Sequence, residues 1–101
     1  MNKDSIGQLE EIVLLIVMRE EAINGAEVLR KYVKLLNKSI SLPAIISVLK
    51  RLEQKGFLDS SLGESTSERG GKRKRLYKAT ATGVAITTEI QAQRNMLWSG
   101  I

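Results

Sequence analysis

The side chains of this chain that could do chemistry are cationic, and they are gathered in one place. Residues 68–80 read ERGGKRKRLYKAT, and ten consecutive positions hold six basic residues with no acid among them: Arg69, Lys72, Arg73, Lys74, Arg75 and Lys78. The whole chain has 16 Lys and Arg against 11 Asp and Glu, so these six supply its entire positive excess. Such a local field favours a polyanionic partner, either nucleic acid or an anionic membrane surface.

Catalytic and metal-binding chemistry has little support. The chain contains no His and no Cys, which excludes Ser–His–Asp triads, Cys nucleophiles, disulfides and most zinc sites. No Gly-rich phosphate loop and no EF-hand loop is present. We therefore predict a protein that is not an enzyme and that holds no metal and no cofactor.

Length and hydropathy indicate a single cytoplasmic domain. The 101 residues lie within the usual range of one domain with one hydrophobic core. The start, MNKDSIGQLEE, does not read as a signal peptide. The longest apolar run, residues 12–18, is far shorter than the roughly 20 residues that a membrane span needs. We expect no membrane partner.

Apolar spacing and capping residues predict the elements that position the basic segment. Ser5-Ile6-Gly7-Gln8 fits a capping box, which would open a first helix carrying the apolar run to residue 18. The other predicted elements are helices over residues 26–36 and about 42–55, strands over 57–62 and 74–79, and a last helix to the C-terminus. Their predicted caps are Asn24, then Ser39 or Ser41, and Thr80 or Thr82.

The order of these elements, α-α-α-β-β-α, is that of a winged helix-turn-helix, a mainly α fold with a two-stranded β wing. We expect residues 1–79 to form the DNA-binding part and residues 80–101 to form a C-terminal dimerisation helix of the same domain. The basic segment would be the wing. Its cations would lie along the phosphate backbone or in a groove of the nucleic acid; the wing residues that we predict to bind DNA are Arg69, Lys72, Arg73, Lys74 and Arg75.

The third predicted helix has the two faces of a recognition helix. Its buried stripe is predicted to hold Leu42, Ile45, Ile46, Leu49 and Leu52. The opposite face is small and polar at its start and basic towards its end. Such a face can approach base edges closely and meet phosphates, and its predicted DNA-binding residues are Ser41, Ala44, Ser47, Lys50 and Arg51.

Surplus apolar surface predicts a homodimer. The first helix is apolar on nearly every side, as either a central core helix or a helix shared with a second subunit would be. The last helix carries apolar residues with little left to cover in so small a domain. The predicted dimer contacts are Ile12, Ile16, Ile86, Ile90, Leu97 and Trp98. Trp98 either anchors this seam or forms the wall of a pocket for a planar, small aromatic ligand.

Three phrases together resemble the PadR family of bacterial transcriptional regulators: IGQLEEIVLLIVM, SLPAIISVLKRLEQKGFL and LGESTSERGGKRKRLYKATATG. The resemblance covers roughly the first 85 residues, and the single short C-terminal helix is similar to that of the small type. It implies a homodimeric regulator of transcription, usually a repressor, with the third helix in the major groove of duplex DNA and the last helix in the dimer interface. It also implies that some members respond to small aromatic or drug-like ligands near that interface.

Two other classes of function remain open. An RNA- or ribosome-associated winged-helix module would use the same basic surface, although only Tyr77 offers a stacking ring beside the basic run. A protein–protein adaptor could use the wing against an acidic partner. Comparing duplex DNA with structured RNA at one salt concentration separates these classes.

Overall fold

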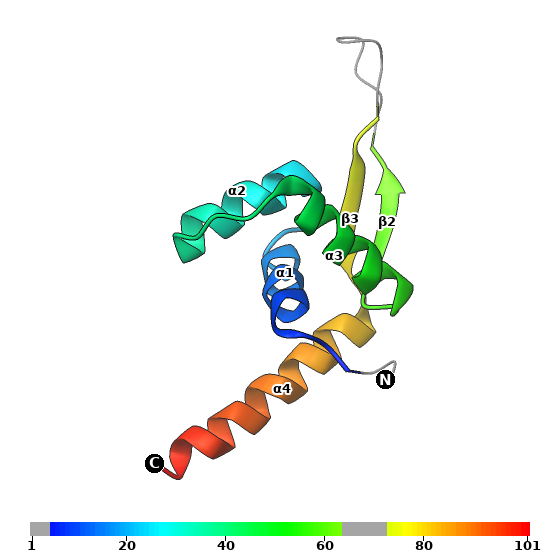
Figure 1. Cartoon of the computed structure of the whole chain (residues 1–101). Helices are drawn as coiled ribbons and strands as arrows, with labels where there is room; N and C mark the ends of the chain where they lie inside the picture. Colours follow the sequence, from blue (N-terminus) through cyan, green and yellow to red (C-terminus); the bar gives the residue numbers. More distant parts are fainter. Residues whose placement is uncertain (1–4, 64–72) are drawn as a thin grey trace.

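The structure is a computed structural model that describes residues 5–63 and 73–101. Its elements in chain order are α1 (Gln8–Met18), β1 (Ile23–Asn24), α2 (Gly25–Leu36), α3 (Leu42–Gln54), β2 (Leu58–Leu62), β3 (Arg75–Ala79) and α4 (Ala81–Ser99). Figure 1 shows α1 at the centre, with α2, α3 and the β2–β3 hairpin around it, and α4 extending away from this body. This arrangement is the predicted winged helix-turn-helix.

The sheet has one more strand than the sequence predicted. Its order is β1-β3-β2 with antiparallel pairing throughout, and β1 contributes only two residues, Ile23 opposite Tyr77 and Asn24 opposite Leu76. A two-residue strand shows no period-2 pattern, so its existence depends on pairing with a distant segment. Since α2 begins at the next residue, β1 holds the start of α2 against the hairpin.

Local side-chain caps begin three of the four helices. The Asn24 side chain accepts from the Glu27 backbone N–H at 3.0 Å, Ser41 caps α3, and Thr80 caps α4, so these caps are confirmed. The capping box predicted at Ser5 is wrong, because α1 begins after Gly7. There the Gly7 backbone N–H donates to Glu10 Oε1 at 2.9 Å, so the acid reaches back to the residue that precedes the helix.

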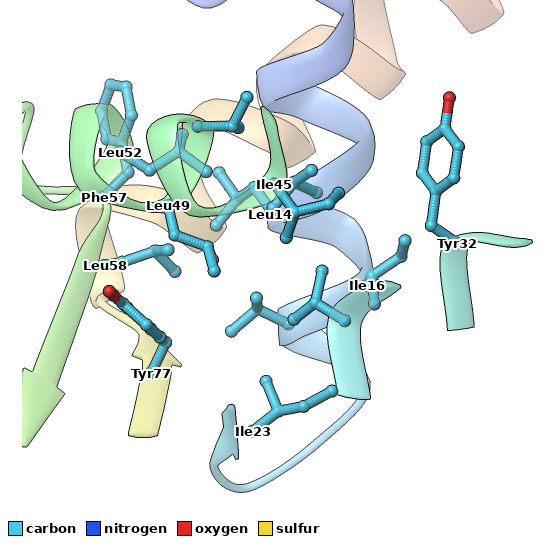
Figure 2. Packing of buried hydrophobic residues seen from close by; sticks show 14 residues of the cluster. Leu14, Ile16, Ile23, Tyr32, Ile45, Leu49, Leu52, Phe57, Leu58 and Tyr77 are labelled. Atoms are coloured by element: carbon cyan, nitrogen blue, oxygen red, sulfur yellow. The ribbon is translucent and has the colours of Figure 1, made fainter. Parts of the chain in front are cut away.

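The hydrophobic core lies between α1, α3 and the sheet. Figure 2 shows Leu14 of α1 and Ile45 and Leu49 of α3 side by side, with Ile23 and Tyr77 reaching in from the strands. The buried residues of α3 are Ile45, Val48, Leu49 and Leu52. The predicted stripe is therefore wrong at Leu42, which is 40% exposed, whereas Ile46 is partly buried and packs against the core. Val48, which was not predicted, is 1% exposed.

An ion pair fastens the start of α1 to the end of α3. Glu10 is buried, and both of its carboxylate oxygens accept from Lys55 Nζ, at 2.8 and 3.0 Å. Arg51 Nε lies 4.0 Å from Glu10 Oε2. Burial alone would raise the pKa of Glu10, but the hydrogen bonds from Lys55 and the Gly7 N–H, with the charges of Lys55 and Arg51, outweigh it and lower the pKa below 4.5.

We predict that Glu10→Gln lowers the free energy of unfolding by about 1–3 kcal/mol at neutral pH, because it removes the charge that Lys55 faces. A carboxylate with a lowered folded-state pKa stabilises the fold above its unfolded pKa, and this contribution is lost as pH falls through the folded pKa. Wild type and variant should therefore converge in acid. Urea unfolding at about pH 7 and about pH 3 measures this convergence.

Glu20→Gln is the control, because Glu20 pairs with Lys31 at a more exposed site. This substitution should lower the free energy of unfolding by less than about 1 kcal/mol. A difference between wild type and Glu10→Gln that stays constant from neutral to acid pH would show that the pair does not contribute through its charge.

Candidate nucleic-acid interface

The outer face of α3 carries the residues predicted to read nucleic acid. Ser47, Lys50 and Arg51 are exposed, and Ala44 is half-buried on the flank of this face. Ser41 is exposed, but its hydroxyl oxygen also accepts from the Ala44 backbone N–H at 3.2 Å, so Ser41 fixes the start of α3. The outer face of α3 is therefore small and polar towards its start and carries the two cations Lys50 and Arg51 towards its end.

The base of the wing adds cations next to this helix. Arg73, Lys74 and Arg75 are exposed, whereas Arg69 and Lys72 lie outside the described residues. In the hairpin register Arg75 lies opposite Leu62 and Tyr77 opposite Ser60. Because side chains alternate along a strand, Arg75 shares the face of the buried Tyr77, and Lys78 points to the other face.

A relay of hydrogen bonds ties Arg75 to α3. The guanidinium donates to Ser60 Oγ at 2.9 Å, and the Ser60 hydroxyl donates to Glu53 Oε2 at 2.5 Å. Glu53 is part of α3, so the relay sets the position of Arg75 relative to α3. The Glu53 carboxylate of α3 therefore accepts a hydrogen bond from within the protein.

An apolar hollow of about 230 Å³ separates α3 from the wing. We name it the α3–wing hollow; its lining residues are Asn24, Gly25, Ala26, Leu42, Ile46, Lys74, Arg75 and Tyr77. A Cβ on Gly25 would lie 2.5 Å from Ile46 Cδ1, so glycine allows the close approach of α2 and α3. Burial and the charge of Glu53 raise the pKa of Tyr77, and Arg75 partly offsets them.

Leu42 and Ile46 belong to this candidate site, although the sequence reasoning assigned both to the core. A signal was present, since Ile45, Leu49 and Leu52 already form a stripe at helical spacing without them. What the sequence did not reveal is that the neighbours of Leu42 and Ile46 come from the wing and from the start of α2.

The predicted dimer residues fall into two groups. Ile16 is 4% exposed within its own chain, and Ile86 packs against the core cluster. The expectation that the α4 stripe has nothing to cover in the domain is therefore wrong for Ile86, because the first half of α4 packs on α1 and β3. Leu97 and Trp98 are 74% and 71% exposed.

A second apolar groove, of about 380 Å³, runs along α1. Its walls come from α1 and the end of α2: Ile12, Leu15, Ile16, Arg19, Leu35 and Leu36. Ile12 of the predicted seam thus lines an open surface, and Ile90 is partly buried on α4. Figure 1 shows the C-terminal half of α4 extending past the body, where residues 91–101 are all exposed.

The described residues contain no cluster of three or more acidic side chains that could hold a metal ion. Within the same ranges, 5–63 and 73–101, no helix is both long and apolar enough to cross a bilayer.

Solved structures with the same fold are transcription regulators. A PadR-like transcription factor from Bacteroides fragilis is 23% identical, with a TM-score of 0.80 over 93% of this chain and 86% of that chain. A PadR family transcriptional regulator from Eggerthella lenta is 24% identical, with a TM-score of 0.73 over 93% and 78%. Bacillus subtilis PadR, solved in complex with operator DNA, is 18% identical in sequence, with a TM-score of 0.73. The match covers 86% of this chain and 48% of that chain.

No protein-family model matches the sequence, and no curated protein sequence matches it. The fold of this chain is a winged helix-turn-helix. More particularly, it is the fold of PadR-like transcription regulators.

Proposed function

We propose that this chain is a transcription regulator of the PadR family that binds duplex DNA sequence-specifically as a homodimer and acts as a repressor. The observation that carries the proposal is the arrangement of α3 and the wing around one hollow. Leu42 and Ile46 of α3 line one side of it, next to the exposed polar and basic face of that helix, and Lys74 and Arg75 line the other side. Base edges and the phosphates beside them present the complementary combination of hydrogen-bonding groups and negative charge.

Association of two copies explains the apolar surface that one chain leaves open. Leu97 continues the helical face of Ile86 and Ile90 beyond the body of the domain, and the exposed ring of Trp98 lies beside it, so in one protomer both face solvent. A two-fold partner would cover them together with the groove on α1. The pair would then present two recognition helices to half-sites about 34 Å, or a multiple of this distance, apart.

A small aromatic or drug-like ligand fits the same seam. Trp98 offers a large exposed ring at the end of α4, and a partner subunit would convert this open surface into a pocket wall. We propose such a ligand as an effector of the dimer. Quenching of the fluorescence of Trp98, the one Trp of the chain, by planar aromatic compounds tests this, and unchanged emission across a panel of them would count against it.

Binding to duplex DNA and to structured RNA at one salt concentration tests the proposed function. We expect the duplex to bind more tightly, because α3 and a neighbouring wing fit the wide major groove, whereas the major groove of A-form RNA is too narrow for side chains to read. Fluorescence anisotropy with labelled probes of equal length gives the comparison. Equal or tighter binding of the RNA would support the RNA-associated module instead.

We predict that Lys74→Ala weakens binding to all duplexes alike. A lysine that meets a phosphate releases a counterion on binding, so its loss should reduce the slope of log K against log salt by about 0.9 per protomer. Lys78→Ala is the matched control, because Lys78 is also exposed on β3 but does not line the α3–wing hollow, and it should change the slope little. A Lys74→Ala protein with weaker binding but an unchanged salt slope would show that Lys74 does not contact a phosphate.

A further inference from the structure

Two apolar side chains of α3 lie at the edge of the core: Leu42 is exposed, and Ile46 is partly buried against the core cluster. Ile45, Val48, Leu49 and Leu52 complete the buried side of the helix, yet Leu42 and Ile46 lie one turn apart on its flank and line the α3–wing hollow. Leu42 is 40% exposed although it stands in the first turn, where a polar residue would fill the position at less cost. If α3 enters DNA, this apolar surface can meet an apolar group of the DNA.

The chemistry of the hollow specifies that partner. Its walls are apolar, formed by Leu42, Ile46 and Ala26, and two cations, Lys74 and Arg75, line its wing side. An apolar group that enters here must therefore be flanked by negative charge. In the major groove of duplex DNA, the C5 methyl of thymine is the apolar group on the base edges, and it lies between two phosphate rails.

We propose that Leu42 and Ile46 recognise thymine by contact with its C5 methyl group. This inference rests on the proposed function, because it assumes that α3 enters the major groove. Leu42 and Ile46 are four residues apart, so their side chains stand together on one side of the helix and can enclose one methyl group, or meet the methyls of two adjacent thymines. The small residues Ala44 and Ser47 lie on another side of α3 and would meet neighbouring positions.

Replacement of thymine by deoxyuridine tests the proposal, because it removes the methyl group and keeps the base pair. The probe is a duplex selected from a random-sequence library by the wild-type protein, in which each thymine is replaced in turn. We expect one or two thymine positions in each half-site to respond. There, wild-type affinity should fall about threefold to fivefold for each methyl group removed.

Protein variants assign the effect to the hollow. In Leu42→Ala and in Ile46→Ala the uridine penalty should shrink to less than about 1.5-fold, since the side chain that met the methyl is shorter. Leu42→Ala is the primary variant, because its exposure leaves the core intact. Val33→Ala is the control; Val33 is 44% exposed on α2 and does not line the hollow, so it should keep the full penalty.

Two results would overturn the proposal. One is a selected duplex on which every uridine substitution is neutral for wild type. The other is a penalty that persists unchanged in both Leu42→Ala and Ile46→Ala. Failure to select any preferred duplex is a different result: it refutes sequence-specific DNA binding itself, and the thymine contact with it.

Discussion

Leu97→Glu should convert the protein from a dimer into a monomer and abolish binding to its operator. Leu97 is 74% exposed in the protomer, so the substitution costs the single fold little. In a two-fold dimer held by the stripe Ile86, Ile90 and Leu97, it would place two carboxylates in an apolar seam. We expect dimerisation to weaken on the order of 100-fold or more. Analytical ultracentrifugation at micromolar concentration, with DNA binding measured in parallel, gives the result.

Met96→Glu is a closely matched control. Met96 neighbours Leu97 in the chain and is 76% exposed, but the helical period turns it away from the stripe of Ile86 and Ile90. The Met96→Glu protein should therefore remain a dimer. If Leu97→Glu stays dimeric with full DNA affinity, or if wild type sediments as a monomer, then α4 does not hold two copies together.

Ser47→Glu should reduce binding to the selected duplex by on the order of 100-fold or more. Ser47 is exposed on the outer face of α3, so a carboxylate there would enter the major groove beside phosphates and base acceptors. In a dimer this repulsion acts twice, once at each half-site. Electrophoretic mobility shift with wild type and variant at one salt concentration measures the loss.

Ala85→Glu makes the same change of charge on the exposed side of α4, away from α3, and should leave most of the affinity. Thermal melting checks that both proteins are folded. Should Ser47→Glu and Ala85→Glu weaken binding equally, net charge would explain the loss, and α3 would not be the element in the groove.

The elements of the fold could be predicted because their signals are local. Asn24, Ser41 and Thr80 each accept from a backbone N–H three residues ahead, so each cap is determined within one turn of helix. The order of helices and strands followed from these caps and from apolar spacing. The β2–β3 hairpin was visible because its strands flank a segment rich in Gly.

The parts that the sequence did not predict depend on contacts between distant residues. The start of α1 moves from Ser5 to Gly7 because Glu10 reaches back to Gly7 while it pairs with Lys55, 45 positions along the chain. Strand β1 exists only through β3. Ile46 lies at the edge of the core, where the wing and the start of α2 form part of its surroundings, which no period within α3 encodes.

The candidate site was predicted in its residue types more completely than in its geometry. The exposed face of α3 and the cations at the base of the wing follow from amphipathic spacing and charge, and the structure leaves both exposed, with Lys74 and Arg75 lining the hollow beside α3. The contributions of Arg69 and Lys72 lie outside the described residues and stay predictions. The relay from Arg75 through Ser60 to Glu53 could not be read from the sequence, because it needs the hairpin register.

Selection of bound fragments from sheared bacterial genomic DNA by the wild-type protein, followed by footprinting of the enriched fragments, tests the central claim most directly. We predict enrichment of a partly palindromic motif whose two protected half-sites lie about one helical turn, or a multiple of it, apart. Bound fragments with no shared motif, at an affinity equal to that of random duplex, would contradict a sequence-specific dimeric regulator.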